Sequence, residues 1–343
     1  MTYRLTEKLE RLTPYEPVAG EYSVRLDANE SFIALPPAIR AEIAEALQTL
    51  AFNRYPDPCA QELLRAYGEY YGLDPRLLTA GNGSDELISV LMNSFFARGE
   101  KVLVASPDFS MYEFYIHLAE LTPVVLPKAG AELNADELLA LAKREGVRGI
   151  IFSNPCNPTA RGLTAADIRK LIRGTDALVI LDEAYMDFWQ QSLLGEVADY
   201  DNLIILRTCS KMLGLAALRL GFAVANERLT TALRAAKSPY NIGTLAQTAG
   251  TIVLRHHEYL DECRARLLAA RDELYTGLCA LPLEVEPTHT NFVLVKAADN
   301  RAVYQALAAR GIAVRLLGNY LRISAGAPAE NRALLSALAE ILA

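Results

Sequence analysis

Three side chains with complementary chemistry lie at intervals in the second half of the chain. Asp182 directly follows the apolar run 178–181, Lys211 follows Ser210, and Arg219 comes shortly afterwards. A lysine supplies an amine for a Schiff base, and an arginine supplies a cation for a phosphate. A carboxylate facing a pyridine nitrogen keeps that nitrogen protonated and makes the ring a better electron sink. These groups together predict a site for pyridoxal 5′-phosphate, with Lys211 as covalent anchor and base.

A glycine-rich segment earlier in the chain could bind the phosphate of such a cofactor. Gly83, Ser84 and Asp85 precede a helical pattern of apolar residues over 87–92. Backbone N–H groups and the positive end of a helix dipole favour anions at that position. Taken alone, the segment is better explained as an ordinary helix cap with a tight turn. The interpretation of this segment as a phosphate site depends on the presence of Lys211 later in the chain.

Three further residues are candidates for contacts with the cofactor ring. Two Asn-Pro steps in 154–159 predict an extended, rigid loop that fixes the Asn157 amide, although the bare motif is also a turn. Tyr185 could share a face with Asp182 and reach a phenolic oxygen, or it could simply pack in the core. Phe109 offers a ring for stacking, with a core role as the equal alternative. Asp182 itself, without Lys211, would be explained as a helix cap.

The elements that must position these residues are typical of an α/β fold. Short apolar runs without alternation predict a buried, mostly parallel sheet. Segments with apolar residues at three- and four-residue spacing predict crossover helices at 135–143 and 165–172. Ligands collect at the carboxyl ends of such strands, which is where the candidate residues stand. The predicted strands are 101–105, 124–126, 149–152, 178–181, 203–206 and 221–224.

The pattern changes near residue 245, where long helical stretches precede a strand at 291–295 and short strands around Val314 and 321–323. We expect a smaller α+β domain there. The predicted division is an N-terminal arm at 1–29 that packs with the small domain, a large cofactor-binding domain at 30–243, and a small domain at 244–343. The segment 238–243 is the expected hinge.

Composition narrows the possible partners. The 343 residues carry a net charge of −7 and no basic stripe, which argues against nucleic acid. The sequence has no apolar stretch of the roughly 18 residues that a membrane span needs, and the N-terminus lacks the apolar core of a signal peptide. We therefore expect a cytoplasmic protein. The five cysteines form no C-x-x-C pair, so neither a disulfide framework nor a metal site is predicted.

The order of these motifs resembles the fold-type I pyridoxal phosphate enzymes, and within them the class II aminotransferase branch that includes histidinol-phosphate aminotransferase. The resemblance covers nearly the whole chain. Where relatives commonly have glycine, this chain has Ala160 and Ala217, both small-for-small changes. The matching blocks are 26–30, 54–57, 81–86, 154–159, 182–185, 207–211 and 321–324.

The resemblance implies a role for each matching residue. Lys211 is the Schiff-base lysine, and Asp182 is the partner of the pyridine nitrogen. Asn157 and Tyr185 face the phenolic oxygen, and Phe109 stacks on the ring. The arginine that clamps the substrate α-carboxylate is Arg322, for which a planar fork is well suited, and Asn29 also contacts substrate. The implied phosphate ligands are the backbone groups of Gly83, Ser84 and Asp85, with Ser210, Arg219 and, from the second subunit of a homodimer, Tyr55.

The implied reaction is transamination between a small amino donor and 2-oxoglutarate. The favoured donor is histidinol phosphate, whose phosphate would be bound by Tyr15 and Arg315; alternatively, Tyr15 only packs and Arg315 is a solvated charge. An aromatic amino acid aminotransferase is the nearest alternative. Threonine-phosphate decarboxylase is the next alternative. A non-catalytic cofactor-bound regulator is the least favoured, because no helix-turn-helix segment accompanies the intact lysine.

Overall fold

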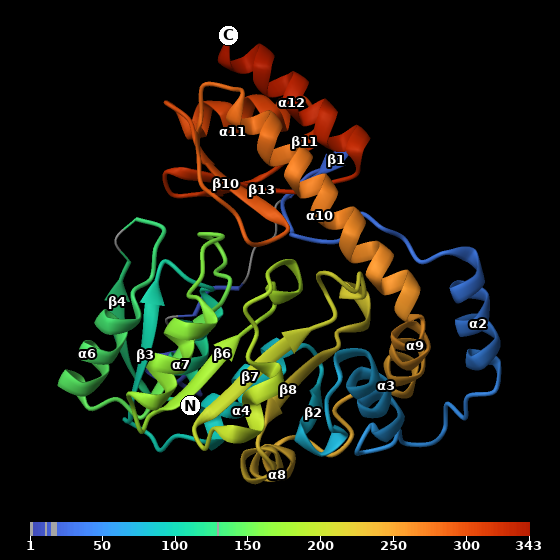
Figure 1. The fold of residues 1–343 in the computed structure, drawn as a ribbon, viewed down its shortest axis with the longest axis vertical. Helices are drawn as coiled ribbons and strands as arrows, with labels where there is room; N and C mark the ends of the chain where they lie inside the picture. The colour runs from blue at the N-terminus through green and yellow to red at the C-terminus, as the bar shows by residue number, and fades with distance from the viewer. Residues whose placement is uncertain (1–2, 11, 15–18, 129) are drawn as a thin grey trace.

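The computed structural model describes residues 3–10, 12–14, 19–128 and 130–343. A large α/β body lies below a smaller body that holds the C-terminus (Figure 1). A long helix, α10 (His257–Cys279), runs from one body to the other. Among the described residues, every helix is too short or too polar to cross a membrane.

The large body is built on a sheet that has seven strands among the described residues, in the order β2-β8-β7-β6-β5-β3-β4. Neighbouring strands from β7 to β4 are parallel, whereas β8 is antiparallel to both of its neighbours. The mostly parallel sheet is therefore confirmed. The strands are β2 (Leu78–Gly81), β3 (Lys101–Ser106), β4 (Thr122–Pro127), β5 (Gly149–Ser153), β6 (Leu178–Asp182), β7 (Leu203–Thr208) and β8 (Gly221–Ala225).

Helices cover both faces of this sheet because its strands are apolar on both sides. Along β6, Val179 and Leu181 belong to one hydrophobic cluster and Ile180 to the opposite one. The first cluster includes residues of α3 (Gln61–Tyr71), α6 (Ala135–Glu145), α7 (Ala165–Arg173) and α9 (Thr244–Arg255). The second includes residues of α4 (Ser84–Ser94), α5 (Met111–Leu118) and α8 (Glu227–Ala236).

The crossover helices begin and end where local chemistry dictates. Thr164 caps α7 through a capping box with Asp167, which satisfies backbone N–H groups that have no partner inside the helix. Asn134 caps α6 by accepting from two backbone N–H groups. Helix α6 ends at Gly146, whose φ of 64° is costly for residues with a Cβ. Both helices agree with the predicted ranges.

The small body has an antiparallel sheet in the order β12-β13-β10-β9, with α10, α11 (Asn300–Ala309) and α12 (Pro328–Leu342) in contact with one another or with its strands. Its core includes Leu274, Val293, Ile323 and Leu334. The predicted α+β unit is therefore present, although Val314 itself lies between two strands. The strands are β9 (Glu284–Val285), β10 (Phe292–Lys296), β11 (Ile312–Ala313), β12 (Arg315–Leu317) and β13 (Tyr320–Ser324).

The N-terminal segment contacts both bodies. Strand β1 (Val24–Arg25) pairs in parallel with β11, and Leu26 joins the core of the small body. The short helix α1 (Glu7–Glu10) instead places Lys8 3.1 Å from Glu120 of the large body. Helix α2 (Pro37–Gln48) and α3 both pack on α9, which begins directly after the expected hinge. The domain boundaries at 29 and 243 stay predictions.

Candidate active site

A cavity of about 490 Å³ lies where the carboxyl ends of the large sheet's strands face the small body. Strands β3, β5, β6 and β7 contribute the residues at or just after their last positions. This is the edge at which parallel α/β sheets bind ligands. The lining residues with predicted roles are Asn29, Ser84, Asp85, Phe109, Asn157, Asp182, Tyr185, Ser210, Lys211, Arg219, Arg315 and Arg322.

Asp182 is a buried carboxylate at the end of β6, with 4% of its surface exposed. Tyr112 Oη donates to its Oδ2 at 2.8 Å, and the Ala184 N–H donates to its Oδ1 at 3.0 Å. Burial raises the pKa of Asp182 to about 7, while these two hydrogen bonds oppose the shift. A cationic ring nitrogen beside this carboxylate would favour its ionised form.

Lys211 follows β7 on a loop that is closed by the Leu215 N–H donating to the Cys209 carbonyl at 2.9 Å. Its Nζ donates to the Ala28 carbonyl at 3.3 Å and lies 5.8 Å from the centre of the Tyr185 ring. The amine therefore stands between the large sheet and the N-terminal segment. Among the described residues, this carbonyl is the hydrogen-bond partner of the amine, and a substrate could displace it.

The predicted phosphate seat is a compact arrangement of Gly83, Arg219 and Asp85. Gly83 has a φ of 85°, and a Cβ there would lie 3.0 Å from Arg219 Nη2, so the close approach requires glycine. Arg219 lies 3.6 Å from Asp85 and 3.3 Å from Ser210 Oγ. Asp85 Oδ1 is buried and has no hydrogen-bond partner among the described residues. Burial raises the pKa of Asp85, and Arg219 opposes this.

Tyr185 and Asn29 are brought together from distant parts of the sequence. Asn29 Nδ2 donates to Tyr185 Oη at 3.0 Å. Asn29 has a φ of 55°, a left-handed conformation that asparagine tolerates better than most residues. Ser324 Oγ donates to Asn29 Oδ1 at 2.9 Å, which fixes this segment to β13 of the small body. The hydroxyl of Tyr185 is therefore oriented by the neighbouring body.

Arg322 on β13 contacts a second predicted residue across the cavity. Its Nη1 donates to Asn157 Oδ1 at 2.7 Å, and its Nη2 donates to the Asp27 carbonyl at 2.6 Å. Arg315 on β12 is directly opposite Arg322 in the sheet register. Arg25 on β1 also lines the cavity and pairs with Asp27 at 3.2 Å. Three arginines therefore come from adjoining strand pairs on one side of the cavity.

The segment 154–159 is a turn, so the predicted extended loop is wrong. Asn154 closes it, because its side chain accepts from the Leu163 N–H at 2.7 Å and donates to the Leu163 carbonyl at 3.0 Å. The Ala160 N–H donates to the Cys156 carbonyl at 2.8 Å. Ala160 has a φ of 60°, a conformation that glycine adopts without strain. This explains why a glycine suits that position.

The single chain does not bring Tyr55 to this cavity. Tyr55 is 81% exposed, and its ring stacks on Tyr240 with centroids 4.5 Å apart. Tyr15 lies outside the described residues. Phe109 does line the cavity, where its ring makes an edge contact with Tyr112 at 5.5 Å between centroids.

Sequence reasoning missed several residues of the site. Tyr112 stands one helical turn after Phe109, and that spacing is the signal that could have found it. Arg25 ends β1 and directly precedes the matched block at 26–30, and Asp27 lies within that block. Asp108 follows β3 and Ser153 ends the neighbouring β5, and neither residue type is specific to a cofactor.

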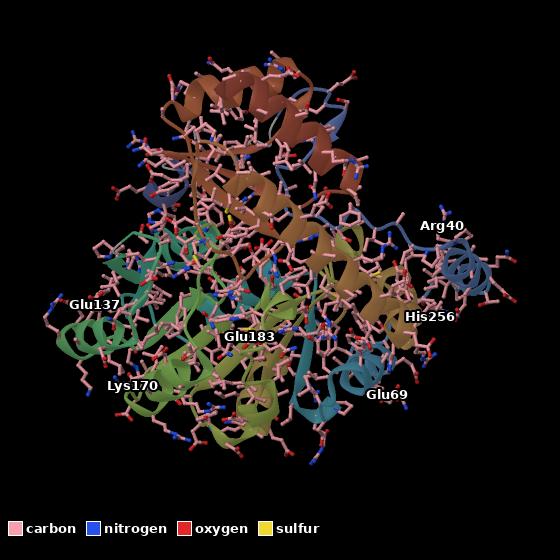
Figure 2. The ribbon with its side chains drawn as sticks, turned by 45° about the horizontal axis from the view of Figure 1, so that its top comes forward. Arg40, Glu69, Glu137, Lys170, Glu183 and His256 are labelled. Atoms are coloured by element: carbon pink, nitrogen blue, oxygen red, sulfur yellow. The ribbon has the colours of Figure 1, made fainter. Side chains whose placement is uncertain are left out.

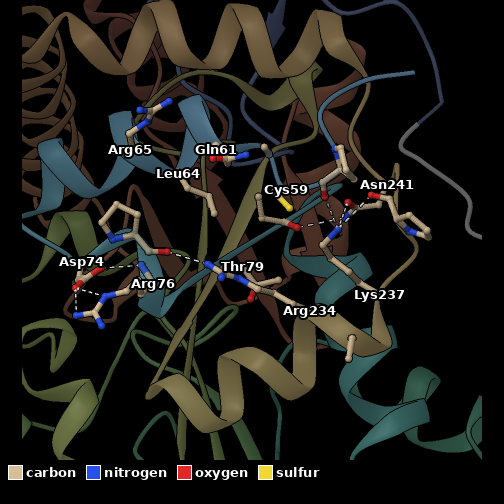
Figure 3. Close-up of a pocket in the computed structure, with 16 residues that line it drawn as sticks. Cys59, Gln61, Leu64, Arg65, Asp74, Arg76, Thr79, Arg234, Lys237 and Asn241 are labelled. Atoms are coloured by element: carbon tan, nitrogen blue, oxygen red, sulfur yellow. Dashed lines mark hydrogen bonds and ion pairs between the residues drawn. The ribbon is translucent and has the colours of Figure 1, made fainter. Parts of the chain in front are cut away.

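A larger cavity, of about 740 Å³, lies apart from this site (Figure 3). Its labelled lining residues include Cys59, Arg76, Thr79 and Lys237. Lys237 Nζ is engaged with Asn241 Oδ1 at 2.9 Å and with three backbone carbonyls. The acid of the larger cavity, Asp74, is paired with Arg76 at 2.7 Å. Its charged groups therefore bond to one another, and the larger volume does not identify it as the reactive site.

The smaller cavity suits the cofactor that its residue types predict. It is lined by the buried acid Asp182, by the amine of Lys211, and by the N-terminus of α4 together with Arg219. Pyridoxal 5′-phosphate, when bound, supplies an electron sink for the Cα of an amino substrate. The arginines opposite can receive a carboxylate or a phosphate.

Comparison with known proteins gives the class to which this site belongs. Residues 22–338 match the family model of class I and II aminotransferases. A histidinol-phosphate aminotransferase of Clostridium novyi is 39% identical over 93% of this chain and 91% of its own length. A second, from Clostridium kluyveri, is 35% identical over 98% of both chains. The chain therefore belongs to the class I and II aminotransferases.

Solved structures agree on the fold. A histidinol-phosphate aminotransferase of Sinorhizobium meliloti, in complex with pyridoxal-5′-phosphate, has a TM-score of 0.89 at 24% identity and covers 100% of this chain and 98% of its own. An L-threonine-O-3-phosphate decarboxylase of Porphyromonas gingivalis has a TM-score of 0.81 at 22% identity, covering 93% and 99%. The predicted family, fold class and cofactor are confirmed.

Proposed function

We propose that this enzyme transfers the amino group of histidinol phosphate to 2-oxoglutarate. The observation that carries the proposal is the group of arginines opposite the lysine. Arg315 and Arg322 are direct neighbours across β12 and β13, and both line the cavity. One cation suits the α-carboxylate of 2-oxoglutarate, and a second suits the phosphate of a donor that has no carboxylate. The relatives' names support the same donor.

Each residue then has a defined task. Lys211 Nζ would hold the cofactor and, when free, would carry the proton that leaves the substrate Cα. Asp182 holds a proton on the ring nitrogen, and Tyr112 keeps that carboxylate oriented. Tyr185 and Asn157 are placed to donate to the phenolic oxygen.

The remaining residues bind or orient. Phe109 is placed to cover the ring. Arg219, Ser210 and the N-terminal N–H groups of α4 hold the cofactor phosphate. Asn29 orients Tyr185 through the hydrogen bond at 3.0 Å. Arg322 binds the α-carboxylate, while Arg315, with Tyr15 from the N-terminal segment, binds the donor phosphate.

A donor panel tests the proposal. Purified enzyme is incubated with histidinol phosphate, phenylalanine or threonine phosphate, each with and without 2-oxoglutarate, and glutamate and CO₂ are measured. We expect glutamate from histidinol phosphate only when 2-oxoglutarate is present. Faster turnover of phenylalanine would favour an aromatic aminotransferase. Release of CO₂ from threonine phosphate without 2-oxoglutarate would favour a decarboxylase.

The exposed aromatic residues support a homodimer with shared sites. Phe52, Tyr55 and Tyr240 are 77%, 81% and 48% exposed, which is unusual for large apolar rings. The larger cavity is lined by residues just after Tyr55 and on both sides of Tyr240. A second copy covering this surface would bring Tyr55 towards the partner's phosphate seat.

A cytoplasmic location stays a prediction.

Subunit mixing tests the shared site. A Tyr55→Ala variant and a Lys211→Ala variant are each expected to have little activity. Heterodimers would contain one site with both native residues, so mixing should restore up to about a quarter to a half of the activity. Verified exchange without recovery would show that each chain holds a complete site.

A further inference from the structure

A buried ion pair lies beside the site and has no part in the reaction described above. Lys128 Nζ is 3.4 Å from Asp108 Oδ2, and the two side chains are 0% and 3% exposed. Lys128 Nζ also donates to Cys156 Sγ at 2.9 Å. Asp108 lines the cavity, whereas Lys128 is absent from the described residues that do so. The lysine can therefore act on the site only through its neighbours.

Asp108 joins the ends of neighbouring strands. It follows β3, Lys128 follows β4, and Ser153 is the last residue of β5. Asp108 accepts from Ser153 Oγ through Oδ1 and from the Ser153 N–H at 3.3 Å through Oδ2. The Lys128 N–H donates to the Ser106 carbonyl at 2.7 Å. Three loops that leave the sheet at the cavity are thereby fixed to one carboxylate.

Ser153 and Asp108 also bond the backbones of Asn157 and Phe109, the two residues that we propose face the cofactor. Ser153 Oγ accepts from the Asn157 N–H at 3.1 Å, and Asn157 Oδ1 accepts from Arg322 Nη1 at 2.7 Å. Asp108 Oδ1 also accepts from the N–H of Phe109 at 2.8 Å. Hydrogen bonds therefore connect Lys128, through Asp108 and Ser153, to the backbone of Asn157, and the side chain of Asn157 connects to the arginine proposed to bind the α-carboxylate.

The energetics favour a positioning role over a stabilising one. Taking both charges out of water costs about as much as their attraction returns, so apolar residues of similar size would often serve stability equally well. Burial raises the pKa of Asp108, and Lys128 and Ser153 oppose this shift. A charged pair at this location fixes hydrogen-bond geometry that an apolar pair could not.

We propose that Asp108 and Lys128 are positioning residues that hold the turn of Asn157 and the ring of Phe109 in register with the cofactor, through Ser153. This rests on the proposed roles of Asn157 and Arg322 in the aminotransferase site. Neither residue is proposed to contact the reacting atoms, and Lys128 is not among the described residues that line the cavity. The effect of the pair should therefore appear in orientation and carboxylate binding rather than in the chemical step.

The first test removes the connecting hydroxyl. In Ser153→Ala we expect the KM for 2-oxoglutarate to rise by about tenfold, the scale of one hydrogen bond to a charged group, with kcat within about twofold. The visible circular dichroism of the bound cofactor should weaken. Thr230→Ala is the matched control, because it deletes a buried hydroxyl on α8 that bonds Leu77 and Ala225. Unchanged KM and dichroism in Ser153→Ala would overturn the proposal.

The second test removes the charges together, which avoids leaving one of them buried alone. Asp108→Asn with Lys128→Met should reproduce the rise in KM and the weaker dichroism. Adding Ser153→Ala should then change little, because residues that act in one network are not additive. Fully additive effects would show that the pair does not act through Ser153. If the double variant does not fold, the comparison of Ser153→Ala with Thr230→Ala decides.

Lys101→Met is the control for loss of a lysine, since Lys101 pairs with Glu145 at the opposite end of β3. Its KM and dichroism should stay at the wild-type value. The dichroism and the cofactor dissociation constant are measured without a donor. A failure of histidinol phosphate as substrate would therefore leave these readouts interpretable, and would count against the proposed function alone.

Discussion

The two sides of the active site differ in how they hold charge. On the large sheet, the acid of the site, Asp182, is buried and accepts from Tyr112, and elsewhere in the same sheet Arg207 bonds Glu183 at 3.1 Å and also Asp187. Figure 2 shows Glu183 in the interior, while surface residues such as Lys170 point outward. On the small body, Arg315 and Arg322 lie on short strands and are only half-buried.

This difference matches what each side binds. The ring nitrogen and the phosphate of the cofactor are the same in both half-reactions, so a buried group such as Asp182 can be fixed against them in advance. Donor and acceptor differ in charge and shape, and arginine forks beside water can accept either a carboxylate or a phosphate. Acids on one side and cations on the other also orient an anionic substrate in the cavity.

The largest expected effect lies on the sheet side. Lys211→Ala should lower turnover by at least about 10⁴-fold, because the same amine is both anchor and base. Borohydride reduction followed by peptide mapping should find the pyridoxyl group on Lys211 in the wild type and nowhere in the variant. A label on another lysine would remove the basis of the proposed site.

Asp182→Asn should reduce kcat by about 10²–10³-fold, the range seen when one preorganised electrostatic contact is lost. The amide cannot hold the ring nitrogen protonated as a carboxylate does. Steady-state kinetics with 2-oxoglutarate and the donor at saturation measure the effect. A loss below about fivefold would show that the buried acid serves packing.

Arg315→Ala tests the substrate side. Losing a charge-assisted contact to phosphate costs roughly 1.5–3 kcal/mol, so kcat/KM for histidinol phosphate should fall about ten- to a hundredfold more than for phenylalanine. Arg322→Ala is the comparison, and it should impair 2-oxoglutarate with either donor. Tyr15→Phe should act like Arg315→Ala but more weakly. Equal losses for both donors in Arg315→Ala would remove the phosphate assignment.

The pH dependence of stability tests the buried acid without the cofactor. The pKa of Asp182 is about 7 in the fold, above its unfolded value of about 3.9. The folded state therefore binds more protons between these values, and its stability falls as pH rises through them. Between pH 5 and 7 the apoprotein should lose on the order of 1–3 kcal/mol relative to Asp182→Asn. Denaturant unfolding of both proteins measures the difference, and parallel curves would contradict it.

The smallest expected effect is that of Tyr112→Phe. It deletes one hydrogen bond to Asp182 and keeps the ring, and that bond is made in the ground state as well as in the transition state, so only about 0.5–1.5 kcal/mol, or roughly two- to tenfold in kcat, should be lost. Tyr115→Phe is the control, since it lies on the same helix and its ring packs beside Phe114 at 5.2 Å. If the two variants behave alike, the hydroxyl of Tyr112 does not orient the acid.

The sequence by itself determined the backbone elements and the chemistry of the main residues. Apolar runs specify buried strands because hydrophobic burial depends only on residue type and spacing, and Asp182 and Lys211 stand where such runs end. The polar residues after each run could be collected without coordinates, because parallel strands end at one edge. Strand β2 was missed because its four residues, Leu78–Gly81, include a threonine and a glycine and give a weak apolar signal.

Only the tertiary structure decided which of those residues touch. Tyr112 reaches Asp182, and Arg322 reaches Asn157, across 70 and 165 positions of the sequence. The pairing of Asp108 with Lys128 and Ser153 follows from β3 lying between β5 and β4. Strand order and the placement of the small body arise from packing between distant segments. The spacing of residues along the sequence does not specify that packing. The sequence therefore predicted the residues of the site but not their partners.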